Sequence, residues 1–195
     1  MSKFLIAGLG NIGDEYANTR HNVGFLVAEA LASALHKEKE GTYGLFRNDR
    51  LASVCDARLK GKSICIIKPN TYMNLSGKAV NYWLQFHNIP LQNLLVITDD
   101  LALPFGTLRM KNKGGDGGHN GLTDIIQTLN TQEFARLRFG IGNEFAKGRQ
   151  VDYVLGEWTQ EEKDKLKERI DKAVEMVNSF VSIGIGKTMS EYNNK

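Results

Sequence analysis

The feature of this chain that most constrains its fold is the regular alternation of short apolar runs with amphipathic helical segments. The run at 94–98 (LLVIT) has no charged side chain, which is typical of a strand in a sheet covered on both faces. The surrounding pattern predicts strands at 4–7, 51–59, 63–68, 107–113 and 136–141, and helices at 23–35, at 76–87, from about Asn120, and from a capping box at Thr159 to Gly184. The sequence therefore predicts an α/β fold: one domain over residues 1–195, with a mixed, largely parallel twisted sheet and helices on both faces.

Composition narrows the class of protein without identifying it. No apolar run approaches the roughly 20 residues that span a bilayer, and the first residues enter a strand-like run without a signal-peptide pattern. We therefore expect a cytoplasmic protein with no membrane partner. The net charge is only +3, but residues 109–149 hold seven Lys or Arg against four Asp or Glu. Such a local excess suits a phosphate-bearing substrate, and an ordinary solvated surface explains it equally well.

The two cysteines are predicted to be structural. Cys55 and Cys65 both lie in apolar strand-like runs that a turn at Lys60-Gly61 would join as a hairpin. Without a secretion signal, two small buried thiols explain them better than a disulfide. Neither has the His or Cys spacing of a metal site, so no metal is expected.

Two glycine motifs resemble nucleotide-binding sequences but lack the required context. The run at 8–13 (GLGNIG) follows a strand, as a dinucleotide fingerprint does, but residues 14–22 are polar and carry no helical stripe. The acidic residue of that fingerprint would fall near Ser33, inside an apolar helix. The run at 186–188 (GKT) resembles the end of a P-loop, but the first glycine would be Val181, so an ordinary C-terminal turn is expected there.

The residues that best suit catalysis lie at the ends of the predicted elements. His21 stands just before a helix, and an imidazole is a base that is available near neutral pH. Asp99 and Asp100 follow the strand at 94–98, where ligands bind in open α/β sheets, and either carboxylate could orient that imidazole or simply cap the strand. His119, in a glycine-rich segment at 114–118, is expected to be structural or to touch a substrate.

Three asparagines extend this set. Asn11 follows the first strand and could donate to a developing oxyanion, while Asn74 and Asn120 precede or begin helices. Each is also explained by turn formation or helix capping, so their common placement is the informative observation. No Ser or Cys in these stretches has the setting of an activated nucleophile. The pattern therefore favours hydrolysis by direct attack of water.

At these residues a family becomes recognisable. The chain resembles bacterial-type peptidyl-tRNA hydrolase over most of its length, from residue 4 to about residue 156. The motifs that carry the resemblance are 4–11 (FLIAGLGN), 16–24 (YANTRHNVG), 72–77 (YMNLSG), 117–122 (GGHNGL) and 134–142 (FARLRFGIG). The resemblance implies cleavage of the ester that joins a peptide to the 3′-terminal ribose of tRNA, by a monomer without a cofactor or a metal.

The resemblance also implies roles for particular residues. His21 would be the catalytic base and Asp99, rather than Asp100, its partner, with Asn11 stabilising the oxyanion. The wall around the peptide and the terminal nucleotide would comprise Tyr16, Met73, Asn74 and Asn120. A clamp for the tRNA 5′-phosphate would comprise Lys111 and Arg138.

Two residues depart from the family pattern, and two other functions compete with this one. Ile12 stands where the family usually has Pro, and Ala102 replaces a usual acidic residue; neither change removes a catalytic group. A non-catalytic RNA-binding module would use the same basic face without a His–Asp pair. A dinucleotide-dependent oxidoreductase is the third possibility and would carry a cofactor with its own absorbance.

Overall fold

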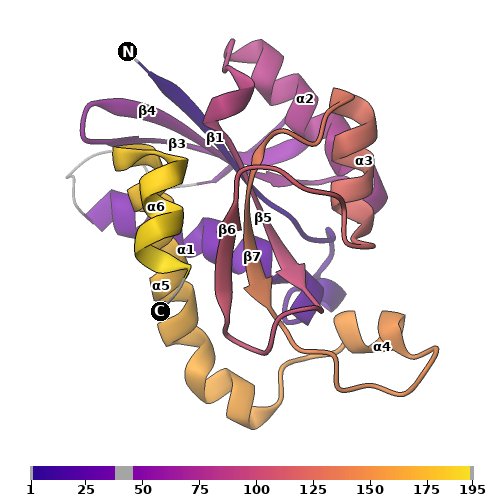
Figure 1. The fold of residues 1–195 in the computed structure, drawn as a ribbon. Helices are drawn as coiled ribbons and strands as arrows, with labels where there is room; N and C mark the ends of the chain where they lie inside the picture. The colour runs from indigo at the N-terminus through magenta and orange to yellow at the C-terminus, as the bar shows by residue number, and fades with distance from the viewer. Residues whose placement is uncertain (1, 38–45, 194–195) are drawn as a thin grey trace.

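A seven-stranded mixed sheet runs through the protein in the order β2-β3-β4-β1-β5-β7-β6 (Figure 1). The computed structural model describes residues 2–37 and 46–193. The strands are β1 (Lys3–Gly8), β2 (Arg47–Asp49), β3 (Ala52–Leu59), β4 (Lys62–Pro69), β5 (Leu94–Asp100), β6 (Leu108–Lys111) and β7 (Ala135–Gly140). The central strands β4, β1, β5 and β7 are parallel neighbours, while β2, β3 and β6 pair antiparallel at the edges. The predicted mixed sheet is thus confirmed.

Helices cover both faces of this sheet, also as predicted. They are α1 (Val23–Lys37), α2 (Ser76–Phe86), α3 (Asn120–Leu129), α4 (Gln150–Val154), α5 (Gln160–Ile183) and α6 (Ile185–Tyr192), with 3₁₀ turns η1 (Asp14–Tyr16), η2 (Arg20–Asn22), η3 (Met73–Leu75) and η4 (Leu91–Asn93). The pair α1 and α5 packs on one face, and α2 and α3 pack on the other (Figure 1). Within the described residues, no helix is long and apolar enough to cross a membrane.

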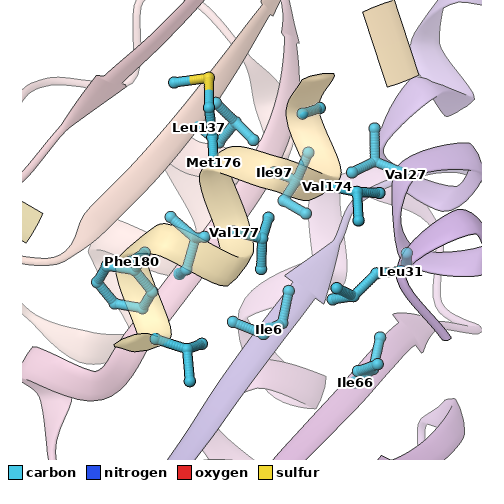
Figure 2. Packing of buried hydrophobic residues seen from close by; sticks show 14 of the residues in the cluster. Ile6, Val27, Leu31, Ile66, Ile97, Leu137, Val174, Met176, Val177 and Phe180 are labelled. Atoms are coloured by element: carbon cyan, nitrogen blue, oxygen red, sulfur yellow. The ribbon is translucent and has the colours of Figure 1, made fainter. Parts of the chain in front are cut away.

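Alternating side chains of the strands supply two separate cores. In β1, Phe4 and Ile6 face α1 and α5, whereas Leu5 and Ala7 face α2 and α3. Figure 2 shows the first core, where Val177 of α5 lies between the sheet and α1. Full burial of one such aliphatic side chain stabilises the fold by about 1.5–3 kcal/mol. The apolar periodicity that predicted the elements is therefore also what holds them together.

The same alternation separates the two cysteines. Cys55 of β3 points into the first core and Cys65 of β4 into the second, so they lie on opposite faces of the sheet. Both are buried and neither forms a disulfide. The prediction of two buried thiols is confirmed.

Several element boundaries differ from those predicted. The strand expected at 94–98 continues to Asp100, so both carboxylates lie within β5 rather than beyond it. The strand expected at 107–113 is only four residues long, β6, because the glycine-rich segment follows. The turn expected at 186–188 is wrong: these residues belong to α6, which Thr188 anchors by donating from Oγ1 to the Gly184 carbonyl oxygen at 2.8 Å. Elements β2 and α4 were not predicted, because both are short and neither buries a side chain fully.

The topology defines where a ligand would bind. From β1 the chain passes through α1 toward β4 on one side of β1, and then through α2 on the opposite face to β5 on its other side. Connections thus leave the neighbours β1 and β5 in opposite directions, which opens a crevice at their carboxyl ends. A dinucleotide fingerprint needs a helix that starts within its glycines. Here the helix that follows β1 begins only at Val23, well beyond Gly13, so this requirement is not met.

Candidate active site

The predicted site residues converge where β1 and β5 end. The backbone N–H of Leu9, just after β1, donates to the Ile97 carbonyl oxygen of β5 at 3.0 Å. Helix α1 starts directly on this junction: a Cβ on Gly24 would stand 2.4 Å from the Leu9 oxygen and 2.6 Å from the Ile97 oxygen. Only a glycine allows the helix to come so close. This approach places η2, the turn immediately before α1, over the end of β5.

The imidazole of His21, carried by η2, faces the carboxylate of Asp99. His21 Nδ1 lies 2.9 Å from Oδ1 and 3.0 Å from Oδ2 of Asp99. The Asp99 side chain is 3% exposed and that of His21 12%. A carboxylate at neutral pH only accepts hydrogen bonds, so Nδ1 carries the proton and donates it. In the neutral ring this leaves Nε2 without a proton, as a base requires.

A second imidazole, that of His119, shares the same carboxylate. His119 Nε2 lies 2.8 Å from Asp99 Oδ1, and the ring centroids of His21 and His119 are 5.0 Å apart. His119 also caps α3, because its Nδ1 accepts hydrogen bonds from the backbone N–H groups of Gly121 at 3.1 Å and Leu122 at 3.4 Å. These contacts fix the tautomer of His119: Nδ1 accepts, and Nε2–H donates to Asp99.

The two imidazoles determine the charge state of Asp99. Burial alone would raise the pKa of this carboxyl, but its interactions with His119 and His21 outweigh burial and hold its pKa below the ordinary value. Asp99 is thus a buried carboxylate that accepts from two ring nitrogens.

The same three side chains are of the types that bind metal ions. Their ligand atoms lie within 4.8 Å of one another. In the observed arrangement each ring nitrogen that faces Asp99 donates its own proton to the carboxylate. A cation at this point would have to displace both protons and separate three groups that already satisfy one another. The arrangement fits a base with its orienting carboxylate better than it fits a metal site.

Asn11 is held rigidly beside this pair. Its backbone N–H donates to Asn22 Oδ1 at 2.8 Å, and its carbonyl oxygen accepts from Asn22 Nδ2 at 2.9 Å. Its side-chain Oδ1 accepts from the backbone N–H of Met73 at 3.0 Å. Because Oδ1 is engaged with a donor, the amide NH₂ of Asn11 remains available to donate to a substrate oxygen.

A cavity of about 100 Å³ opens beside these groups. Its lining includes His21, Asp99, His119 and the exposed Asn120 at the start of α3. Met73 lies deeper, since it is buried and a Cβ on Gly121 would meet its sulfur at 2.7 Å. Asn74 is exposed on η3 and Tyr16 is half-buried in η1; neither lines this cavity. The fold therefore brings His21, Asp99 and Asn120 together around the cavity. Asn11 does not line it either, but its hydrogen bonds to Asn22, the residue after His21, hold it near that turn.

Comparison with known proteins agrees with this geometry. The family model for peptidyl-tRNA hydrolase matches residues 5–195. The chain belongs to the peptidyl-tRNA hydrolase family. The peptidyl-tRNA hydrolase of Phocaeicola vulgatus is 53% identical over 193 residues, covering 99% of this chain and 100% of that protein, and that of Bacillus subtilis is 42% identical over 191 residues, covering 98% of each. The crystal structure of peptidyl-tRNA hydrolase from Acinetobacter baumannii is similar at a TM-score of 0.88 and 36% identity, covering 98% of this chain and 94% of that one.

The basic residues expected to bind phosphate lie on the neighbouring edge of the sheet. Lys111 is exposed on β6, and Arg138 lies on β7 with its Nε donating to Asp100 Oδ2 at 2.6 Å. The register pairs Arg109 with Arg138 and Lys111 with Arg136. Directly opposed residues project from the same face of a sheet, so these four cations share one face. In this peptidyl-tRNA hydrolase family member, the basic patch of Arg109, Lys111 and Arg138 borders the candidate active site through Asp100, while Arg136 on the same face is buried.

Asp99 and Asp100, which the sequence left equivalent, have different partners. Asp100 binds Arg138 and accepts from the Ala102 backbone N–H at 2.8 Å, so it joins the basic patch and caps the end of its strand. Ala102, one of the two departures from the family pattern, therefore retains the backbone contact. Ile12, the other departure, is 49% exposed beside Asn11, so the Asn22 contacts rather than a proline ring hold that loop.

Two further residues that support the site were missed. Asn22 was quoted only within a motif, although it fixes the backbone of Asn11. Arg136 is 2% exposed and donates to the carbonyl oxygens of Gly114 at 2.7 Å and Gly115 at 3.0 Å, so it anchors the glycine-rich segment that leads to His119. An Arg at the start of an apolar strand was the available signal, because a cation there has to find buried acceptors.

Arg20, the residue before His21, ties η2 to the segment around α4 and α5. Its Nη2 lies 2.9 Å from Glu162 Oε2, and its guanidinium stands 4.3 Å from the ring centroid of Tyr153. Glu162 is also part of the predicted capping box, which is confirmed: its Oε2 accepts from the Thr159 backbone N–H at 2.7 Å. Arg20 thus fixes the turn that carries the His21 imidazole.

Replacing Arg20 with alanine should lower the free energy of unfolding by up to about 3–5 kcal/mol, because the largely shielded Glu162 would lose its cationic partner. Both side chains are largely shielded, 8% and 14% exposed, so solvent screening is small. Chemical denaturation measures the change. Glu161→Gln is the matched control, since it removes the exposed Lys165–Glu161 pair one residue away and should change stability by less than about 1 kcal/mol. Equal effects of the two variants would show that Arg20 does not anchor the turn.

Proposed function

We propose that this protein hydrolyses peptidyl-tRNA, cleaving the ester between the peptide and the 3′-terminal ribose so that free tRNA returns to translation. We further propose that it acts as a monomer, as one domain over residues 1–195, in the cytoplasm, on tRNA rather than on membranes. The observation that carries the proposal is the His21–Asp99 hydrogen bond, which leaves the second ring nitrogen of His21 unprotonated beside a cavity. Membership of the family supports the substrate.

The proposed reaction uses side chains alone. His21 Nε2 takes a proton from water, and the resulting hydroxide attacks the ester carbonyl carbon. The amide NH₂ of Asn11 donates to the oxyanion that forms, while Asp99 stabilises the imidazolium. The tetrahedral intermediate collapses as Nε2–H returns the proton to the ribose 3′-oxygen. The peptide leaves with a carboxyl group, and the tRNA leaves with a free hydroxyl.

We expect N-acetylated aminoacyl-tRNA to be hydrolysed much faster than unblocked aminoacyl-tRNA. The proposed contacts to the peptide side of the ester are the amides of Asn74 and Asn120, which suit a neutral peptide amide and offer no carboxylate to a free α-ammonium. The experiment incubates each substrate with the enzyme and follows release of the acyl group. Equal rates would show that these asparagines do not sense the peptide bond, and hydrolysis of neither substrate would contradict the proposed function.

Lys111→Ala and Arg138→Ala should each weaken substrate binding and leave turnover at saturation mostly unchanged. Each lost phosphate contact should also make the plot of log affinity against the logarithm of salt concentration less steep by about one unit. Affinity titrations with tRNA over a series of salt concentrations give both the dissociation constant and its salt dependence. A tRNA that lacks its 5′-phosphate should be insensitive to both substitutions.

Lys167→Ala is the control for these variants, because Lys167 is a highly exposed cation on α5 outside the basic patch. It should leave affinity and salt slope at wild-type values. If Lys111→Ala and Arg138→Ala also did so, the phosphate would bind elsewhere and the roles taken from the family for these two residues would be wrong. The rival function, a non-catalytic RNA-binding module, requires tRNA binding without any release of the acyl group.

A further inference from the structure

A second group of ligand-type side chains lies far from the catalytic crevice. It consists of Asp56 on β3, Cys65 on β4 and His87 at the C-terminal end of α2. The carboxylate, thiol and imidazole atoms of these residues lie within 4.8 Å of one another. They border a cavity of about 270 Å³. Carboxylate, thiolate and imidazole together form a donor set typical of zinc.

Sheet register and helix packing bring these three residues together. Asp56 and Cys65 are direct cross-strand partners, so their side chains leave the same face of the sheet. Helix α2 covers that face and ends above them, with the His87 backbone N–H donating to the Trp83 carbonyl oxygen at 3.2 Å. The His87 ring lies 5.0 Å from the Phe86 ring and 5.5 Å from the Trp83 ring. The aromatic contacts and the helix end therefore fix where the imidazole points.

The imidazole carries an unsatisfied nitrogen into this group. His87 Nε2 is buried and has no hydrogen-bond partner in the part of the chain that the structure describes. A buried polar atom without a partner costs about 1–3 kcal/mol, so such an atom requires an explanation. A metal ion would satisfy this nitrogen where no protein group does.

We infer that Cys65, His87 and Asp56 form a binding site for a zinc ion. Zinc accepts sulfur, nitrogen and oxygen donors in tetrahedral geometry at about 2.0–2.3 Å, which places ligand atoms roughly 3–4 Å apart. The three atoms already lie within 4.8 Å of one another, close to that range. Three protein ligands leave one position for water from the adjoining cavity.

The surrounding charges set the conditions for binding. Zinc binding displaces the proton of the Cys65 thiol to solvent as the zinc–sulfur bond forms. Arg47 donates to Asp56 Oδ2 at 2.8 Å, and this carboxylate has to share its oxygens between the guanidinium and the metal. Lys3 donates to the His87 backbone oxygen at 3.3 Å, outside the ligand set.

This site is independent of the proposed hydrolysis. Cys65 pairs with Leu5 early in β1, whereas His21 and Asn11 lie beyond the other end of that strand. None of the three ligands borders the catalytic cavity. Zinc at this position would join β3, β4 and the end of α2, and it would support the fold without taking part in ester cleavage.

The test titrates the full-length, reduced and chelator-treated protein with Zn²⁺, and separately with Co²⁺ as a spectroscopic probe. We expect one Zn²⁺ per chain by dialysis and metal analysis, and a Co²⁺–thiolate charge-transfer band that Zn²⁺ abolishes. Cys65→Ala should remove the band, and His87→Gln should weaken binding by more than about 100-fold, which exceeds the usual effect of losing a group behind a ligand. Cys55→Ala is the matched control, since that thiol lies on the other face of the sheet, and it should keep the band.

Circular dichroism and ester hydrolysis test whether each variant is folded. Because His87 lies at the end of α2, His87→Gln should disturb the core least. The inference is overturned if the wild type gives no thiolate band, or if the band survives in Cys65→Ala. It is also overturned if His119→Ala abolishes zinc binding while Cys65→Ala and His87→Gln retain it. That result would place the metal among His21, Asp99 and His119.

Discussion

Replacing His21 with alanine is expected to lower kcat by about 10²–10⁴-fold, the usual contribution of a general base. The reason is geometric: the His21 Nδ1–H donates to Asp99, and Nε2 is the one ring nitrogen that can take a proton from water beside the cavity. Substrate affinity should stay nearly intact, because the proposed tRNA contacts lie on β6 and β7. Steady-state kinetics with N-acetylated aminoacyl-tRNA and a separate tRNA-binding measurement give the two quantities.

His36→Ala provides the control, since this exposed histidine lies near the other end of α1. It should leave kcat unchanged. Near-normal turnover in His21→Ala would refute the mechanism, whereas a large loss of tRNA affinity without a loss of kcat would make His21 a binding residue. The rival RNA-binding module predicts no hydrolysis in either the wild type or the variant.

The sequence predicts the central part of this fold well, because the apolar pattern there is both the local signal and the source of stability. The fully buried strand β5 and the amphipathic helices α1 and α5 were assigned from periodicity, and their buried residues form the observed cores. In contrast, β2 has three exposed residues and α4 buries none. Short elements that bury no side chain are held in place by tertiary contacts. In α4, the Tyr153 hydroxyl donates a hydrogen bond to the Ile141 carbonyl oxygen. Such contacts leave no periodic signal.

The site was predictable in outline and not in detail. The argument from strand ends placed Asp99 near His21, and resemblance to the family chose it over Asp100. The shared hydrogen bond from His119 could not be read from the sequence, because it depends on how the segment before it turns. Gly117 and Gly118 adopt φ of 58° and 79°, and the resulting path brings His119 back toward β5. Backbone geometry of this kind is permitted by glycine but not specified by it.

The zinc ligands show a further limit of spacing arguments. Sequence motifs for metal sites rely on ligands a few residues apart, whereas Asp56, Cys65 and His87 come from two strands and the end of a helix. Their approach depends on the hairpin register between β3 and β4 and on where α2 ends. The predicted turn at Lys60-Gly61 and the predicted helix end near residue 87 agree with both, but the packing of α2 over β3 and β4 does not follow from the local pattern.

Asp99→Asn is expected to lower kcat by about 10²–10⁴-fold, although the side chain keeps its size. In the wild type, the Asp99 carboxylate accepts hydrogen bonds from two imidazoles. An asparagine at this position offers only one accepting oxygen and one donating NH₂. His119 can only donate here, because its other nitrogen already accepts from the Gly121 and Leu122 backbone N–H groups. The asparagine oxygen should therefore turn toward His119, and its NH₂ toward His21. That forces the His21 proton onto Nε2, the atom that has to be free, and a wrong tautomer of this kind costs an acyl-transfer enzyme about 10⁴-fold.

A tautomer change and a simple loss of charge predict different results for a double variant. Removing His119 in the same background, as Asp99→Asn with His119→Ala, frees the amide to rotate its oxygen toward His21 and to restore the active tautomer. The double variant should therefore turn over faster than Asp99→Asn alone, a non-additivity expected for groups in one hydrogen-bond network. Asp100→Asn is the neighbouring control: it acts on Arg138 and should change affinity more than kcat. If the double variant is slower than either single variant, the tautomer argument fails, and His119 has to contribute to the reaction in its own right.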